Sequence, residues 1–478
     1  MRNIEKQVMR IYSRPLKRLV WMDPEISIPK EMEKFLSQEN SVSALVKGAP
    51  GTGKTILVLS TIRILGASES FYLTTRVKPQ RLVSDFPWIK EFIPYDHIVD
   101  ATTTIFPTIR AEKAKEIPYG LIRYADKPAF LREFYQLIEK TQKPVIVIDS
   151  IETIQKVTGE ETFYDLLDIC REINSKIIFV SEYEEVKRFD YVVDGVILLK
   201  RYIINGKILR VMQIDKLRGI ACRNPQYLFT LYGGYFRYFK PFKPSIPRER
   251  KRFEPLPDSE RFFSTGSRDL DRILGGGYVK GSTILFEIGK DVERDAYFQL
   301  YLPTVLNFLT HGKHVSILAS LGTSSEKIVS LLTGFVSDEE LKNLSINTKV
   351  WTEGMLDAAK ARLIIAFDEH GIEIEVEEEG FLFLRGLDAL SDLYKENLPK
   401  IIERGIFETQ EKRVLTILAA KHGYQQLDHV ANMVDFHFKI EKRNGVLLFH
   451  AAKPRTQFYA MEIDYTKGYP QLRLVPVE

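Results

Sequence analysis

The segment GAPGTGKT, residues 48–55, restricts what this chain can fold into more than any other part of the sequence. It has the spacing G-x-x-x-x-G-K-[ST] and lies between an apolar run, VSALVKG, and a helical pattern, TILVLSTIRIL. Glycines let a strand-to-helix turn direct its backbone N–H groups inward, which forms a nest for phosphate oxygens at a helix N-terminus. The predicted phosphate cradle consists of Gly48, Ala49, Pro50, Gly51, Thr52, Gly53, Lys54 and Thr55.

The side chains of this segment predict a nucleotide with its metal ion. Lys54 should reach the β and γ phosphates, and the Thr55 hydroxyl should bind Mg²⁺. The metal also needs a carboxylate at the end of a neighbouring strand, and PVIVIDS supplies Asp149 after four apolar β-formers. An acid in this position can also be a helix N-cap. Because the loop is present, we favour the metal role and expect ATP and Mg²⁺ as cofactors.

The first half of the chain alternates short β-branched runs, such as SFYLTT and KIIFVS, with amphipathic stretches such as AFLREFYQLIEKTQ. Strands that alternate with helices predict a mostly parallel sheet with helices on both faces. Asn205–Gly206 lies between two apolar runs, which is a hairpin signal, so we expect the sheet to end in antiparallel strands.

The pattern then begins again, which indicates an internal repeat of about two hundred residues. STILFEIG, GFLFLRGLDAL and RVLTILAA are expected strands, and a second NG hairpin follows at Asn444–Gly445. We therefore predict two tandem RecA-like α/β domains, the second of them degenerate. The expected boundaries are an ATP-binding domain at 1–240, an extended linker rich in proline and basic residues at 241–261, and a pseudo-ATPase domain at 262–478.

The remaining composition excludes several classes. No stretch of the chain approaches eighteen apolar residues, so we expect no membrane span. Cys170 and Cys222 lack metal-ligand spacing, and a reducing cytoplasm is the simplest location. A net charge of +4 permits nucleic-acid binding without arguing for it. The aromatic and basic stretch YGGYFRYFKPFKPSIPRERKRF fits either a single-strand binder or a strand edge with its linker.

Several motifs resemble a known group of proteins. FSTGSRDLDRILGGGYVKGSTILFEIG, at the start of the second half, is similar to the entry segment of KaiC- and RadA-type ATPases of the RecA superfamily. VDGVILL and LRVMQIDKLRG, near the end of the first half, resemble the end of a KaiC domain. IPKEMEKFL and YLTTRVKPQRL are more similar to the archaeal gas-vesicle regulator GvpD, which is itself KaiC-like.

The resemblance also exposes a departure. KaiC-type domains place two adjacent glutamates after the second strand, one of which activates the attacking water. Arg76 and Val77 stand at these positions and cannot act as a base. Glu152 and Glu182 could replace the base, or they are ordinary surface or capping acids. Ser181 matches a polar sensor near the γ-phosphate.

A second pair, Lys216 and Arg218, matches the K-x-R motif that reaches from one subunit of a KaiC-like ring into the nucleotide site of its neighbour. Alternate residues of a strand share a face, so both cations could approach one phosphate. Charged protection of a solvated edge strand is the other interpretation. The resemblance favours the catalytic one and implies a homo-oligomer, such as a hexameric ring.

The second loop has lost these residues. Aligned at Gly289, it carries Arg294-Asp-Ala296 in place of G-K-T, and Arg385 in place of the acid of PVIVIDS. Lys453 and Arg455 nevertheless repeat the K-x-R motif, so this domain could still complete a neighbouring site.

From these observations we predict a weak ATPase that acts as a nucleotide-dependent switch or scaffold for regulatory protein partners. The alternative is a RadA-like repair ATPase that binds single-stranded DNA. A structural component with a permanently bound nucleotide is a third class.

Overall fold

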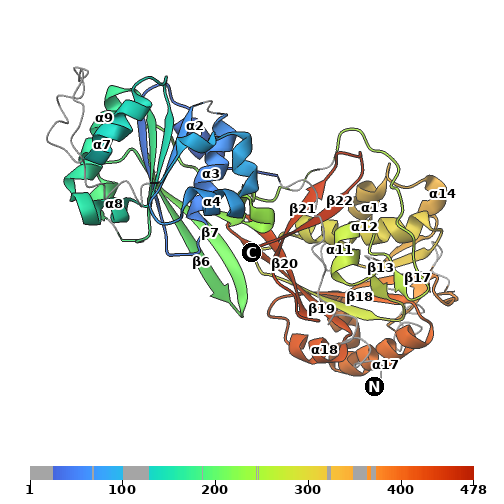
Figure 1. Cartoon of the computed structure of the whole chain (residues 1–478). Coiled ribbons are helices and arrows are strands. Elements are labelled where there is room, and N and C mark those ends of the chain that lie inside the picture. Colours follow the sequence, from blue (N-terminus) through green and yellow to red (C-terminus); the bar gives the residue numbers. More distant parts are fainter. Residues whose placement is uncertain are drawn as a thin grey trace. The chain divides into compact units, whose positions relative to one another are not determined.

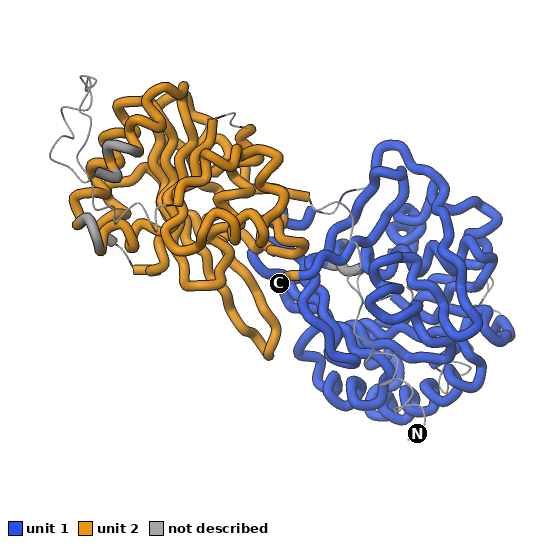
Figure 2. Tube along the Cα trace, viewed as in Figure 1, with its two compact units in different colours: residues 1–19, 240–476 blue, residues 20–239, 477–478 orange. Residues whose placement is uncertain are grey.

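The computed structural model describes residues 25–66, 69–100, 129–185, 187–243, 245, 247–319, 324–347, 363–367 and 373–478. These residues form two compact units, which we call the N-terminal unit (25–239 with 477–478) and the C-terminal unit (240–476) (Figure 2). Each unit is built around one nine-stranded sheet. Within the described ranges, no helix is long and apolar enough to cross a membrane.

The N-terminal sheet has the order β3-β2-β4-β5-β1-β6-β7-β8-β9. The strands from β3 to β6 are parallel, and β7, β8 and β9 are added antiparallel. Their bounds are β1 Val42–Lys47, β2 Ser70–Thr74, β3 Ile98–Asp100, β4 Val145–Asp149, β5 Lys176–Ser181, β6 Gly195–Ile204, β7 Lys207–Leu217, β8 Gln226–Thr230 and β9 Arg237–Tyr238.

Helices cover both faces of this sheet, with α2, α3 and α4 on one side and α7, α8 and α9 on the other (Figure 1). Neighbouring residues of β1 pack into different cores, because successive side chains of a strand point to opposite faces. Val46 packs with Leu57 of α3, whereas Leu45 packs with Phe163 of α9. The helices are α2 Lys30–Leu36, α3 Lys54–Leu65, α4 Pro79–Asp85, α7 Ala129–Ile138, α8 Ile151–Thr158, α9 Glu161–Glu172 and α10 Lys187–Asp190, with short 3₁₀ helices at Pro87–Glu91, Tyr95–His97 and Tyr232–Gly234.

The C-terminal sheet repeats the first one strand for strand, in the order β14-β13-β17-β18-β12-β19-β20-β21-β22. Its strands are β12 Thr283–Ile288, β13 His314–Leu318, β14 Leu344–Asn347, β17 Phe381–Gly386, β18 Leu415–Lys421, β19 Phe436–Arg443, β20 Val446–Lys453, β21 Tyr459–Asp464 and β22 Gln471–Pro476. The predicted fold class, two tandem RecA-like α/β domains with antiparallel strands at the end of each sheet, is confirmed.

The remaining elements of this unit are helices on both faces of the sheet and two small antiparallel pairs (Figure 1). The helices are α11 Arg268–Ile273, α12 Arg294–Thr310, α13 Ser325–Leu332, α14 Asp338–Leu341, α16 Leu387–Tyr394, α17 Leu398–Glu411 and α18 Leu427–Met433, with a 3₁₀ helix at Lys395–Asn397. The small pairs are β10 Phe262–Phe263 with β11 Tyr278–Val279, and β15 Ala366–Phe367 with β16 Glu373–Ile374.

Both hairpins form where the NG dipeptides predict them. Asn205 and Gly206 have φ values of 51° and 69°, and Asn444 and Gly445 have values of 47° and 78°. Two successive positive φ angles are the requirement of a type I′ turn, whose twist matches that of the flanking strands.

Two expected segments differ from the structure. GFLFLRGLDAL is not one strand: β17 ends at Gly386 and α16 begins at Leu387, because Leu387 and Leu390 bury one face of a helix. The described part of the linker contains no helix or strand, but it is more than a connector. Phe253 is buried in the C-terminal core, and Arg250 donates hydrogen bonds to the carbonyls of Ser330 and Thr333.

Candidate functional site

The glycine loop joins the end of β1 to the start of α3. Gly51 and Gly53 have φ values of 77° and 101°, which favour glycine. A Cβ atom on Gly48 would lie 2.5 Å from the carbonyl oxygen of Leu199, and one on Gly53 would lie 2.6 Å from Leu231. The loop therefore needs glycine for its conformation and for its close contact with the adjacent chain.

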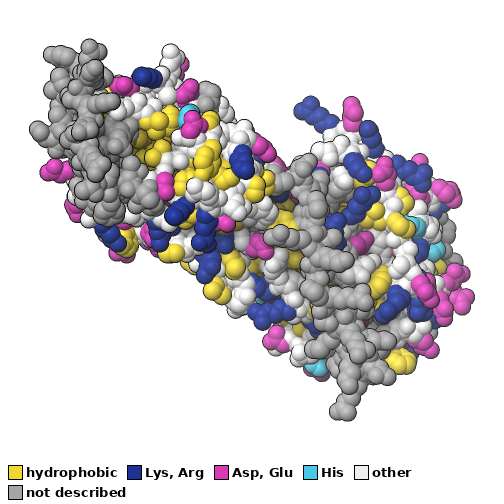
Figure 3. Space-filling view, viewed as in Figure 1, with side chains coloured by type: hydrophobic (Ala, Val, Ile, Leu, Met, Phe, Trp, Pro, Cys, Tyr) yellow, Lys and Arg dark blue, Asp and Glu magenta, His cyan; other side chains and the backbone are white. Residues whose placement is uncertain are grey.

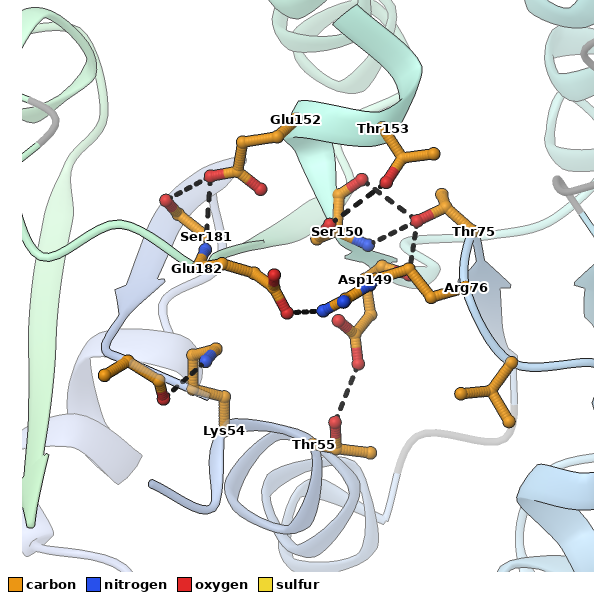
Figure 4. A network of polar contacts seen from close by, with 12 residues as sticks. Lys54, Thr55, Thr75, Arg76, Asp149, Ser150, Glu152, Thr153, Ser181 and Glu182 are labelled. Atoms are coloured by element: carbon orange, nitrogen blue, oxygen red, sulfur yellow. Dashed lines mark hydrogen bonds and ion pairs between the residues drawn. The ribbon is translucent and has the colours of Figure 1, made fainter. Parts of the chain in front are cut away.

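Lys54 lies over this loop as the first residue of α3 (Figure 4). Its Nζ atom donates to the carbonyl oxygens of Gly48 and Ala49, at 2.6 and 3.1 Å. Burial lowers the pKa of the ammonium group, while the charges of Asp149 and Glu152 raise it. A buried ammonium beside a nest of N–H groups is placed to bind phosphate oxygens.

Asp149 and Thr55 meet at the end of β4, as the motif predicts. The Thr55 hydroxyl donates to Asp149 Oδ2 at 2.8 Å (Figure 4). Tyr72 donates its hydroxyl to the same oxygen at 2.6 Å. A carboxylate and a hydroxyl are hard oxygen ligands, so this donor set fits Mg²⁺.

The role of Tyr72 was missed in the sequence. Burial, followed by the charge of Asp149, raises the pKa of its hydroxyl, so the group stays a hydrogen-bond donor. The signal was present in SFYLTT, because β2 lies next to β4 with Tyr72 opposite Val147, and Val147 and Asp149 share one face of β4.

The two candidate bases have different partners. Glu152 begins α8, and its Oε1 accepts from the Ser181 hydroxyl and, at 3.2 Å, from the backbone N–H of Glu182. Its Oε2 is buried and has no hydrogen-bond partner among the described residues. The Glu182 carboxylate forms an ion pair with Arg76 instead (Figure 4). The structure thus brings Ser181, Glu152, Glu182 and Arg76 together beside Asp149.

Lys216 and Arg218 do not join this cluster in their own unit. Lys216 is paired with Val196 near the beginning of β6, whereas the glycine loop follows the other end of β1. The Lys216 Nζ donates to the carbonyls of Asp190 and Val193 at 3.0 and 2.6 Å. Arg218 pairs with Asp194 at 2.8 Å. The K-x-R pair thus lies at the opposite end of the strands from the glycine loop of its own unit.

A different arginine of the hairpin contacts the loop. Arg210 is 8% exposed and donates to the carbonyl oxygens of Gly51 and Thr52, at 3.0 and 3.4 Å. It lies directly across the strands from Arg201. Counting residue pairs back from the NG turn would have placed these two arginines opposite each other, but not their approach to the loop.

The corresponding loop of the C-terminal unit is held by ion pairs and backbone contacts. Lys421 donates to the carbonyl of Val292, and Lys442 pairs with Glu293 at 2.8 Å. With Gly289 aligned to Gly48, the sheet registers match Asp149 to Leu387, two residues beyond Arg385. The expected match to Arg385 is therefore displaced by two residues, and the aligned position still carries no metal ligand.

Arg385 has a structural role. It is 3% exposed and donates to the carbonyls of Ser316, Leu363 and Ile365, at 2.7, 3.1 and 2.6 Å. Burial lowers the pKa of its guanidinium to about 9. Its hydrogen bonds hold β13 against residues 363–365 and leave it no role at a phosphate.

Where the first unit has the apolar Val46, the second has a buried carboxylate, Glu287. It is bonded by His422 at 2.6 Å, His437 at 2.9 Å and Lys439 at 2.8 Å. Burial alone would raise the pKa of Glu287, but the hydrogen bonds from His437, Lys439 and His422 outweigh it and lower the pKa to about 2.

This cluster predicts a pH dependence of stability. A carboxylate whose pKa is lower in the folded state stabilises the fold above its unfolded pKa, and this stabilisation is lost as the pH falls from 4.5 toward 2. The contribution is on the order of 3 kcal/mol. Urea unfolding should show that Glu287→Gln destabilises the chain at pH 7 and flattens the acid side of its profile. Glu441→Gln, at a more exposed carboxylate, should do so less; equal effects would contradict the prediction.

Comparison with known proteins agrees with this geometry. A family model described as ATPase: KaiC matches residues 36–235, the part that holds the glycine loop, Asp149 and the hairpin. The chain carries a KaiC-like ATPase domain. A second model, GvpD basic region 2, matches residues 252–334. The predicted resemblance to KaiC and GvpD is thereby confirmed.

Relatives of both kinds match the chain. GvpD1 of Halobacterium salinarum is 24% identical, with 94% of this chain and 96% of that protein covered. GvpD2 of the same organism is 24% identical over 93% of this chain and 95% of its own length. The circadian clock oscillator protein KaiC of Thermostichus vulcanus is 23% identical over 51% of this chain and 47% of its own length. The GvpD likeness therefore extends through both units.

Proposed function

We propose that this KaiC-like protein binds one Mg·ATP in its N-terminal unit, hydrolyses it slowly, and acts as a nucleotide-dependent switch or scaffold for partner proteins. The observation that carries the proposal is the Thr55–Asp149 contact beside Lys54 at the mouth of the glycine loop. A phosphate ligand, a metal hydroxyl ligand and a metal carboxylate come from three separate elements and meet at one edge of the sheet. The likeness to GvpD supports the regulatory role.

The chemistry assigns a task to each side chain. Lys54 would neutralise the β and γ phosphates, and Thr55 and Asp149 would hold Mg²⁺, which would supply charge neutralisation to the phosphates. Tyr72 fixes the Asp149 carboxylate through its hydrogen bond. Arg210 restrains the loop by holding two of its carbonyls, so that the N–H groups remain directed at the phosphates.

Glu152 is the base that the geometry favours. One of its oxygens is fixed by the Ser181 hydroxyl and the N–H of Glu182, and the other has no hydrogen-bond partner within the described ranges. A carboxylate that is oriented by one oxygen and unpaired at the other can accept a proton from water. Glu182 is less suited because its charge is neutralised by Arg76.

Turnover should therefore be slow and should depend on Glu152. We expect a rate well below the enzyme median of about 10 s⁻¹, because Arg76 stands where KaiC-type domains carry a base. Glu152→Gln should lower the rate by roughly 10²–10⁴ in a phosphate-release assay. Glu160→Gln, at an exposed carboxylate paired with Arg188, should leave it unchanged. A rate at or above the median, or a larger loss from Glu182→Gln, would reject this assignment.

The alternative of a RadA-like DNA-binding ATPase gains no support from the comparisons. Several cations in the region matched to GvpD basic region 2 are already paired within their unit: Arg252 with Glu340, Lys280 with Glu379, and Lys313 with Asp258. On the visible face of the C-terminal unit, basic side chains are interspersed with acidic ones (Figure 3). A sequence-independent nucleic-acid site needs an uninterrupted basic surface, so we favour protein partners.

A further inference from the structure

Arg76 and Glu182 form their ion pair across the carboxyl edge of the N-terminal sheet (Figure 4). Arg76 follows β2 and Glu182 follows β5, and β4 lies between these strands. The pair therefore crosses the end of β4, next to the Asp149 carboxylate that accepts the Thr55 hydroxyl. It lies where the terminal phosphate of a nucleotide in the glycine loop would approach.

Other contacts already hold the backbone on both sides of this ion pair. The Thr75 hydroxyl bonds the carbonyl of Asp149 at 3.0 Å and accepts the N–H of Ser150 at 2.7 Å. The N–H of Glu182 is held by Glu152. An ion pair of this exposure, with 51% of the Arg76 side chain and 25% of the Glu182 side chain accessible, adds little to stability. Holding the loops together is thus a weak reason for the pair.

The charges of the site suggest another role. Burial lowers the pKa of Lys54, and the positive charge of Arg76 lowers it further. Two cations share this end of the sheet, and Glu182 neutralises one of them. A γ-phosphate brings negative charge and several acceptor oxygens to the same place, and a guanidinium binds phosphate at least as well as carboxylate.

We propose that Arg76 is the residue by which the site distinguishes a nucleoside triphosphate from a diphosphate. With a diphosphate bound, Arg76 remains paired with Glu182. With a triphosphate bound, the guanidinium exchanges the carboxylate for the γ-phosphate, and the segment after β5 loses its tie to the segment after β2. The inference rests on the proposed function, because it requires a nucleotide in the glycine loop.

The test is the affinity of the full chain for Mg·ADP and for the non-hydrolysable Mg·AMP-PNP, measured by calorimetry. Arg76→Met should weaken AMP-PNP binding about tenfold or more and change ADP binding by no more than about twofold. Glu182→Gln should strengthen AMP-PNP binding, because the competing carboxylate is removed, and leave ADP binding unchanged. A purely structural ion pair would make both variants shift affinity in the same direction.

Two further variants keep the result interpretable. Arg76→Lys retains the charge and should recover part of the preference for AMP-PNP. Arg188→Met removes an exposed arginine of the same unit, paired with Glu160, and should change neither affinity. Equal losses for both nucleotides in Arg76→Met, or parallel shifts in Arg76→Met and Glu182→Gln, would overturn the inference. A wild-type chain that binds neither nucleotide would instead overturn the proposed function.

Discussion

Lys54→Ala should abolish measurable binding of Mg·ATP to a chain that remains folded. The ammonium group is 7% exposed and already makes two hydrogen bonds to the loop carbonyls, so it is positioned before the nucleotide arrives. Hydrogen bonds to charged groups contribute about 1.5–3 kcal/mol each, and the loss of two to phosphate corresponds to about 10² in affinity or more. Calorimetry measures the affinity, and thermal unfolding shows that the variant is folded.

The same titration measures stoichiometry. We expect one nucleotide per chain, because the C-terminal loop has Ala296 at the position of Thr55 and is held by Lys421 and Lys442. Lys290→Ala is the matched control, since Lys290 is the lysine of the degenerate loop and is exposed. Its binding isotherm should equal that of the wild type. Two Mg·ATP per chain, or binding that survives Lys54→Ala, would contradict the assignment of the site.

The Lys216→Ala/Arg218→Ala double variant should still bind ATP but hydrolyse it about 10³–10⁵ times more slowly, the range for an arginine finger. Lys216 is level with Val196, about 10 Å along the strands from the loop after β1, and its ammonium is held by carbonyls beyond that end. The pair cannot reach the nucleotide of its own unit, so we expect it to act on another site.

Mixing two inactive chains tests this directly. A Lys54→Ala chain has an intact K-x-R pair and should restore hydrolysis to the double variant if the pair acts between molecules. Activity that stays at the sum of the two variants at every ratio would rule out an intermolecular finger. Lys453→Ala is the comparison in the C-terminal unit, where Lys453 bonds the carbonyl of Val434 as Lys216 bonds that of Val193. Loss of activity there would assign a finger to that unit.

Local patterns predicted the parts of this molecule that depend on local chemistry. The glycine loop, the apolar strands and the two type I′ turns each need particular residue types at a few adjacent positions. The repeat could also be read, because Asp194 and Asp435 stand before equivalent strands. Even the start of α16 was within reach, since Leu387 and Leu390 follow a helical period rather than an alternating one.

The contacts between distant segments could not be predicted in the same way. Arg76 and Glu182 are brought together because β2 and β5 flank β4, an order that is a property of the whole sheet. Glu287, His422 and His437 come from three strand ends and form one cluster only after the sheet is assembled. Each of these side chains, taken singly, has the composition of an ordinary surface position.

The identical strand order of the two sheets gives the molecule an internal reference. The C-terminal sheet has the same connectivity and a similar arrangement of helices but lacks the phosphate and metal ligands, so it reports how such a sheet behaves without ligand. In a hydrogen-exchange experiment, each peptide of β1, β4 and β5 has a counterpart in β12, β17 and β18. Protection that appears on adding Mg·ATP in the first set and not in the second measures the effect of the nucleotide alone, free of differences in temperature, pH or labelling time.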